Sequence, residues 1–142
     1  MNRYALDTSI LLRWFSQDSD PDTARALQLR QSHLEESSEL VVLDQSLYEL
    51  LHVLKESASF DQNRVEQALA SLHFMHIGIE SFSGALASRA IQIAFEHQIS
   101  LFAAGPVALG AHLRCQTVTC DYGLYQKVSS LPWTALLSRL NI

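Results

Sequence analysis

The sequence predicts an α/β fold with three layers, in which a parallel sheet of four to five strands lies between helices on both faces. Short apolar segments alternate with longer segments of helical periodicity, and no linker, repeat or low-complexity stretch separates them. Strands that alternate with helices form such sheets. The apolar run 40–43 is typical of a strand covered on both faces. With 142 residues, 48% of them hydrophobic, the chain is predicted to form a single domain over residues 1–142.

The first half of the chain is predicted to contain two strands and four helices. Asp20 followed by Pro21 is a typical helix start, with a capping acid before a proline in the first turn. The leucines from 47 to 54 recur at the spacing of one buried helical stripe. In chain order, the predicted elements are strand 3–7, helix 9–16, a helix from 20–22 to about 37, strand 40–43, helix 46–57 and a helix around 65–72.

The second half is predicted to alternate in the same way. A long segment rich in alanine is suited to pack closely on a sheet, and a second helix precedes the strand that ends in Asp121. The predicted elements are strand 76–79, helix 82–98, a helix over roughly 104–114, strand 116–121 and a fifth strand over 133–137.

Composition excludes several classes of protein. The net charge of −5 and the pI near 5.6 argue against a general nucleic-acid coat, because non-specific affinity depends on Lys and Arg contacts to phosphates. The apolar runs are shorter than the ~20 residues that a membrane helix needs, and the acid at position 7 argues against a signal peptide. Cys115 and Cys120 form neither a disulfide framework nor a zinc motif. We expect a cytoplasmic protein without a membrane partner.

Two acids end predicted strands at opposite ends of the chain. Asp7 follows the apolar segment 4–6, and Asp121 closes the segment 116–120. In an open parallel sheet, ligands bind beyond the carboxyl ends of the strands, so these two carboxylates are candidates to hold a divalent cation together. Each also has a simpler explanation, Asp7 as the cap of helix 9–16 and Asp121 as a turn residue.

Glu49 is a third candidate acid. It lies on the polar face of its predicted helix, opposite the leucine stripe. Two other roles remain open for this side chain. In the first, the polar face is exposed to solvent and Glu49 has no specific contact. In the second, Ser46 and Glu49 form a capping box, in which the glutamate reaches back to the helix start.

The order of these acids resembles the PIN domain, and most closely the VapC-like toxins of bacterial toxin–antitoxin pairs. The family opens with a strand leading to Leu-Asp-Thr/Ser, which is similar to residues 6–9 here. It continues with a glutamate in a leucine-rich helix, matched by residues 47–51, and ends with Thr-x-Asp, matched by residues 119–121. The resemblance covers nearly the whole chain. It implies a nuclease fold whose acids hold Mg²⁺ or Mn²⁺ for cutting RNA.

The chain departs from the family pattern at one acid. The family has an aromatic-Asp-Ala step before the last strand, and the matching segment 99–109 has Ala103 at the position of the aspartate. Gly105-Pro106 beside it is also unusual, and the proline predicts a late start of the helix. The alanine is either native or an engineered replacement, and the altered Gly-Pro pair favours natural drift.

The resemblance also assigns roles to individual residues. Asp7, Glu49 and Asp121 are the expected catalytic acids, and Asp7 and Asp121 the expected metal ligands. Position in the predicted elements adds further candidates. These are Thr8, Ser9 and Thr119 as donors that orient the acids, Asp44 at the end of the second strand as a substitute acid or a helix cap, and Arg13 and Arg114, each on a helix that starts near the site, as phosphate contacts.

The sequence is therefore compatible with two functions. The first is a ribonuclease of the VapC-like toxin type, with catalysis weakened by Ala103; the second is a non-catalytic PIN module that binds RNA or a protein partner. The resemblance implies an antitoxin partner, in a groove near helices 9–16 and 22–37. It also implies a homodimer, for which Leu51, Leu54 and helix 85–95 are candidate contacts.

Overall fold

The computed structural model describes residues 1–142 and contains one five-stranded parallel sheet in the order β3-β2-β1-β4-β5. The chain visits the strands on one side of β1 first and then those on the other side. The strands are β1 (Asn2–Leu6), β2 (Ser38–Leu43), β3 (Gly78–Glu80), β4 (Gln116–Thr119) and β5 (Thr134–Leu136). The helices are α1 (Thr8–Trp14), α2 (Pro21–Leu34), α3 (Asp44–Glu56), α4 (Gln62–Phe74), α5 (Gly84–His97), α6 (Leu101–Leu113) and α7 (Tyr122–Val128), with a final 3₁₀ turn over Leu137–Arg139.

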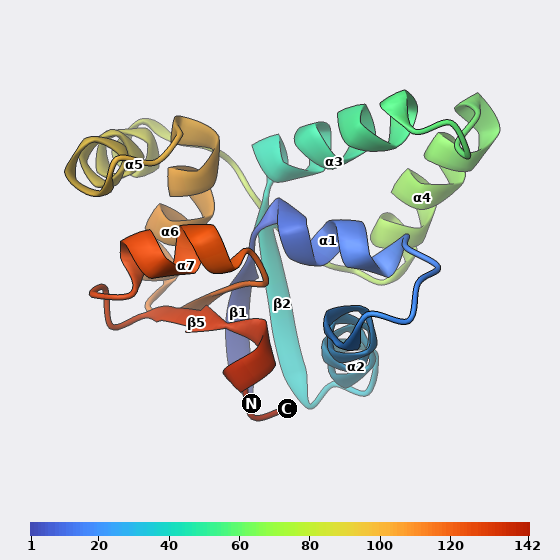
Figure 1. Cartoon of the computed structure of the whole chain (residues 1–142), viewed down its shortest axis with the longest axis horizontal. Helices are drawn as coiled ribbons and strands as arrows, with labels where there is room; N and C mark the ends of the chain where they lie inside the picture. The colour runs from blue at the N-terminus through green and yellow to red at the C-terminus, as the bar shows by residue number, and fades with distance from the viewer.

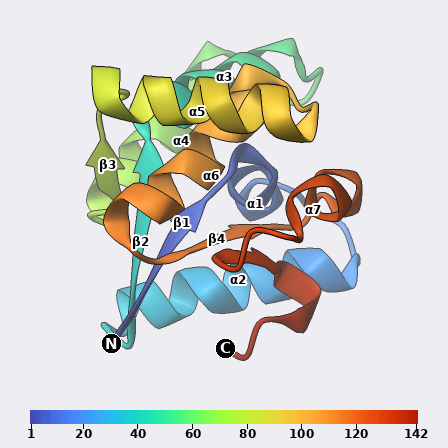
Figure 2. The ribbon, with the colours of Figure 1, turned by 90° about the vertical axis from the view of Figure 1, so that its left-hand side faces the viewer.

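Helices cover both faces of the sheet, which confirms the predicted three layers. Helices α1 to α4 lie on one side, and α5 and α6 lie on the other, with α7 beside β5 (Figure 1). The view turned by 90° shows α3 and α5 at the same end of the molecule, above the carboxyl ends of β1 and β2 (Figure 2). None of the helices has the length and apolarity required to cross a bilayer.

Alternating side chains of the central strands build two separate cores. Tyr4 and Leu6 of β1 pack with α1 and α2, whereas Ala5, between them, packs with α5 and α6. Successive side chains of a strand point to opposite faces, so the middle residues of β1 and β2 are covered on both sides and are apolar. This explains why residues 40–43 form a continuous apolar run, with two buried side chains on each face.

Helix α6 begins earlier than the sequence predicts. It starts at Leu101, and the Ser100 hydroxyl accepts a hydrogen bond from Ala103 N at 3.1 Å. Pro106 lies inside the helix without delaying its start. A Cβ on Gly105 would lie 2.9 Å from Leu43 Cδ1, so the glycine permits a close approach between α6 and the end of β2. The unusual Gly-Pro pair therefore fits an otherwise intact helix.

Two further local predictions are wrong. Helix α3 begins at Asp44 rather than at residue 46, so Ser46 lies inside the first turn and the proposed capping box with Glu49 does not form. The sequence predicts no helix after strand 116–121, whereas the structure has α7 there. Asp121, considered there as a turn residue, is the N-cap of α7 and accepts a hydrogen bond from Leu124 N at 3.1 Å.

Candidate functional site

Strands β1 and β4 end side by side. They meet at the point in the sheet where the chain changes from one side of β1 to the other. The register pairs Leu6 of β1 with Val118 of β4. Asp7 and Thr119 are the next residues on each strand, and the Asp7 N–H donates to the Val118 carbonyl at 3.3 Å. Ligands of open α/β sheets bind at such a switch point, beyond the carboxyl ends of the strands. The topology therefore places Asp7 where a ligand site is expected.

Asp7 is a buried acid held by three donors. Its Oδ1 accepts hydrogen bonds from the Ser9 hydroxyl at 2.6 Å and from Ile10 N at 3.3 Å, and its Oδ2 accepts one from the Thr119 hydroxyl. The bond from Ile10 N caps α1. Asp7 is thus both the helix cap that the simpler explanation predicted and an acid fixed in one orientation.

The donors to Asp7 are themselves held by the β4–α7 connection. The Ser9 oxygen accepts hydrogen bonds from Cys120 N at 3.1 Å and from the Cys120 thiol at 3.3 Å. The Thr119 oxygen accepts one from Asp121 N at 3.0 Å. Both hydroxyl protons are therefore directed at Asp7. Thr8 lines the same cleft but donates no side-chain hydrogen bond to Asp7, so of the three predicted hydroxyl donors Ser9 and Thr119 orient this acid.

Burial sets the charge of Asp7. Removal from water disfavours the ionised carboxyl and raises the pKa of Asp7 from 3.8 to about 6. Hydrogen bonds from Ser9, Thr119 and Ile10 oppose this rise in pKa, and the negative charge of Asp121 adds to it. Near neutral pH the carboxyl is mostly ionised, in a place where a cation would lower the cost of that charge.

The three expected acids line one cleft. Asp7, Glu49 and Asp121 share a cavity of about 260 Å³ with Ala103, so the structure brings all three acids to one cleft at the carboxyl edge of the sheet. The acids reach this cleft from the end of β1, the second turn of α3 and the start of α7. The other lining residues are Thr8, Ser9, Leu12, Ser100, Phe102, Pro106 and Leu124.

The acids do not form a complete metal centre. No three His, Cys, Asp or Glu side chains lie close enough together to hold a metal ion as a group. Asp7 Oδ1 already accepts two hydrogen bonds, which leaves Oδ2 as its better ligand atom. Mg²⁺ needs only one or two carboxylates when waters and substrate phosphate complete its shell. Asp7 and Asp121 supply that minimum.

Asp44 does not replace the missing acid. Its Oδ1 accepts hydrogen bonds from Gln45 N at 2.7 Å and from Phe82 N at 3.3 Å, which connects the start of α3 to the segment before α5. Asp44 lines a neighbouring groove with Glu49 and is absent from the cleft that contains Asp7. The sequence predicts a substitute ligand or a helix cap, and in the structure the Oδ1 of Asp44 has a structural role while its side chain also lines the groove.

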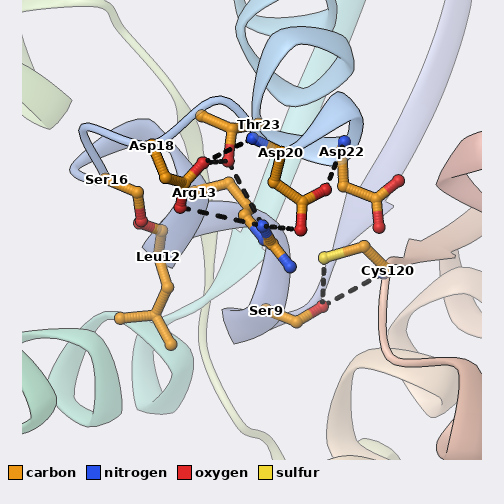
Figure 3. Close-up of polar contacts among 9 residues, drawn as sticks. All are labelled: Ser9, Leu12, Arg13, Ser16, Asp18, Asp20, Asp22, Thr23 and Cys120. Atoms are coloured by element: carbon orange, nitrogen blue, oxygen red, sulfur yellow. Dashed lines mark hydrogen bonds and ion pairs between the residues drawn. The ribbon is translucent and has the colours of Figure 1, made fainter.

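Arg13 is committed to the α1–α2 connection. Its guanidinium lies 3.1 Å from Asp20 Oδ2 and 4.0 Å from Asp18 Oδ2, and it donates to the Thr23 hydroxyl at 3.2 Å (Figure 3). The hydrogen bond from Asp22 N and the contact with Arg13 lower the pKa of Asp20. Two carboxylates therefore neutralise the arginine that was expected to bind phosphate.

Arg114 lies at the opposite end of the sheet from the acids. It is the C-terminal cap of α6, in the left-handed region with φ of 55°, and it shares a cavity with Arg3 and Gln116 at the amino ends of β1 and β4. The prediction that Arg114 contacts phosphate at the acidic site is wrong. The prediction rested on a helix that starts near the site, but Arg114 follows the last residue of that helix and so lies at its far end.

Two residues of this region were not proposed from the sequence. Phe102 belongs to the aligned segment around Ala103, yet its 66% exposure was not predictable from periodicity. The sequence assigns Cys120 no role at the site, but both its N–H and its Sγ contact Ser9. Its place between Thr119 and Asp121 in the sequence was the available signal.

Comparisons with known proteins agree with this geometry. The chain matches the PIN domain family over residues 4–129, while no curated protein matches it. A toxin–antitoxin complex from Klebsiella pneumoniae is similar in structure, with a TM-score of 0.70 and 16% identity over 96% of this chain and 98% of that one.

Two further solved structures have the same fold. The toxin VapC20 from Mycobacterium tuberculosis, which cleaves the sarcin-ricin loop, gives a TM-score of 0.69 at 16% identity over 93% of this chain and 96% of that one. VapBC2 from Rickettsia felis, solved with a promoter DNA fragment, gives a TM-score of 0.68 at 15% identity over 94% of this chain and 96% of that one. The family match, the parallel sheet and the acids at its switch point lead to one conclusion: the chain belongs to the PIN domain family.

Proposed function

We propose that the protein is a metal-dependent ribonuclease of the VapC-like toxin type, with catalysis weakened at Ala103. The observation that carries the proposal is the shared cleft of Asp7, Glu49, Asp121 and Ala103 at the switch point of the sheet. Solved toxins have the same fold, although at 15–16% identity that likeness supports the fold alone.

In this proposal the acids divide the work. Asp7 and Asp121 would hold one Mg²⁺ or Mn²⁺, which would activate a water and stabilise charge on the scissile phosphate. Ser9 and Thr119 keep the Asp7 carboxylate in one orientation through their hydroxyls. Glu49 faces the cleft from α3 and accepts a proton from the attacking water. Ala103 lines the cleft at the position of a fourth acid, so the ion would be held by fewer protein ligands.

Cleavage of single-stranded RNA by the purified protein in Mg²⁺ or Mn²⁺ tests this proposal. We expect slow cleavage that is abolished by EDTA and by Asp7→Asn, since asparagine keeps the shape of the side chain but loses the charge that binds the ion. Cleavage that persists in Asp7→Asn would assign the activity to a contaminant or to another site.

The alternative is a PIN module that binds RNA or protein without cutting. The absence of a three-ligand cluster and the alanine at position 103 favour this second function. It predicts RNA binding with no metal-dependent cleavage in either Mg²⁺ or Mn²⁺, together with no shift of the melting temperature by either ion.

Partners follow from the same proposal. An antitoxin segment would lie in the groove of about 410 Å³ beside α1, whose other wall comes from α3 and the following loop rather than from α2. For a homodimer, Leu54 is unavailable because it is buried in the core, whereas Ile91 and Phe95 on α5 are exposed. A dimer through α5 should sediment at twice the monomer mass and dissociate in Phe95→Ser.

A further inference from the structure

A larger groove adjoins the acidic cleft. It has a volume of about 860 Å³ and lies between α3 and the start of α6. Glu49 and Phe102 line both hollows, so the groove and the cleft are continuous. A chain that placed one phosphate in the cleft would place its next unit in this groove. The groove is lined by Asp44, Gln45, Tyr48, Glu49, His52 and Phe102.

Two exposed aromatic rings form the apolar part of the groove. Tyr48 of α3 is 79% exposed and Phe102 of α6 is 66% exposed, and they reach the same groove from different helices. Rings this exposed bury little apolar surface and contribute little to the core. Aromatic side chains along a single-strand path bind unpaired nucleobases by stacking.

The charges of the groove select a neutral ring over a phosphate. Neither the groove nor the acidic cleft is lined by a Lys or Arg side chain, and Asp44 and Glu49 bring carboxylates to the groove. These carboxylates repel phosphate but accept hydrogen bonds from the exocyclic amino groups of cytosine, adenine or guanine. Uracil has no such amino group.

We propose that Tyr48 and Phe102 form a stacking site for one unpaired nucleobase of a single-stranded RNA, next to the scissile position, and that Asp44 and Glu49 favour a base with an exocyclic amino group. This inference rests on the proposed function for the choice of RNA, and it adds a specificity site to it. The base would enter the groove while the adjoining phosphate reaches the acidic cleft, where Asp7 and Asp121 would hold the metal ion.

Fluorescence of 2-aminopurine in a short single-stranded RNA tests the site, because stacking on an aromatic ring quenches this base. Binding is measured in the Asp7→Asn background, which prevents cleavage. We expect quenching on binding, and its loss in Tyr48→Leu and Phe102→Leu with roughly tenfold weaker binding for each. Phe74→Leu is the matched control, since Phe74 is 86% exposed on α4 and lines neither hollow. Circular dichroism verifies that each variant is folded.

Base preference and oligomeric state complete the test. Oligomers of cytidine or adenosine should bind more tightly than uridine oligomers, and the difference should shrink in Asp44→Asn. Unchanged quenching in both leucine variants overturns the proposal. A shift from dimer to monomer in those variants also overturns it, because the rings would then form a contact between copies of the chain. Normal metal-dependent cleavage with no stacking would overturn the stacking site and leave the proposed ribonuclease function intact. Stacking without any cleavage by the parent protein would support the stacking site and contradict the ribonuclease function.

Discussion

The Thr119 hydroxyl donates a hydrogen bond to Asp7 Oδ2 across 112 positions of the sequence. The bond connects the ends of β1 and β4, which are paired through Leu6 and Val118. It also fixes the direction of the Thr119 proton, because the threonine oxygen accepts from Asp121 N at 3.0 Å. One side chain thereby positions both acids that we propose as metal ligands.

Asp7→Asn should stabilise the metal-free protein at neutral pH. The pKa of Asp7 is raised from 3.8 to about 6, so the folded state binds a proton more tightly than the unfolded state between those values, and stability falls as pH rises through about 6. Asparagine removes this penalty, which is worth at most roughly 3 kcal/mol from a shift of this size.

Urea unfolding of both proteins from pH 4 to pH 8 measures this effect. The advantage of the Asn variant should be largest above pH 7 and should vanish near pH 4. A constant difference across the range would show that it does not arise from titration of Asp7. Mg²⁺ or Mn²⁺ should stabilise the parent protein alone, since only the carboxylate gains from a bound cation.

Ala103→Asp should strengthen metal binding and RNA cleavage. Ala103 lines the cleft with all three acids and lies in the first turn of an intact α6, so a carboxylate there faces the proposed ion. Without metal, the added charge should raise the pKa of Asp7 further through like-charge repulsion. Calorimetric titration with Mn²⁺ and single-turnover cleavage measure the two gains, and Asp7→Asn should remove both. Equal cleavage by parent and variant would show that a fourth acid is not needed.

Gly110→Ala should destabilise the fold. A Cβ at this position would lie 2.1 Å from Thr117 Oγ1 and 3.0 Å from Trp133 Cδ1, so α6 would be pushed away from β4. Overpacking of this kind costs about 1–3 kcal/mol. The matched control is Gly84→Ala at the start of α5, where a Cβ meets nothing within 4 Å. The control should be neutral or slightly stabilising in the same thermal unfolding experiment, because alanine favours the helix.

Arg13→Gln should affect stability more than RNA affinity. The guanidinium is bound to Asp20, Asp18 and Thr23, and its loss leaves the α1–α2 connection with two uncompensated carboxylates. Partly exposed pairs of this kind contribute about 0.5–1 kcal/mol, and less at high salt. Arg114→Gln removes the same charge at the far end of the sheet and serves as the control. A selective loss of RNA affinity in Arg13→Gln at unchanged stability would contradict this role.

Local sequence patterns were sufficient to predict most of the secondary structure and to select three acids that line one cleft. Apolar runs such as 40–43 and the leucine spacing in α3 are short-range signals, since they reflect burial on one or two faces. The ordered set of Asp7, Glu49 and Asp121 identified the family, and the family match over residues 4–129 confirmed it. The start of α6 was mispredicted because Ser100 caps the helix before Pro106, a preference that outweighs the proline.

Tertiary structure alone decided how those residues meet. The reversal of strand order between β1 and β4 places Asp7 beside Thr119, and no local pattern specifies which strands become neighbours. Burial, which raises the pKa of Asp7, comes from the packing of distant elements around it. The roles of Arg13 and Arg114 also depend on tertiary structure. Arg13 is paired with Asp20 in the α1–α2 connection, and Arg114 lies at the end of the sheet opposite the acids. Sequence determines which side chains are available, whereas strand order and packing determine which of them share a site and in what charge state.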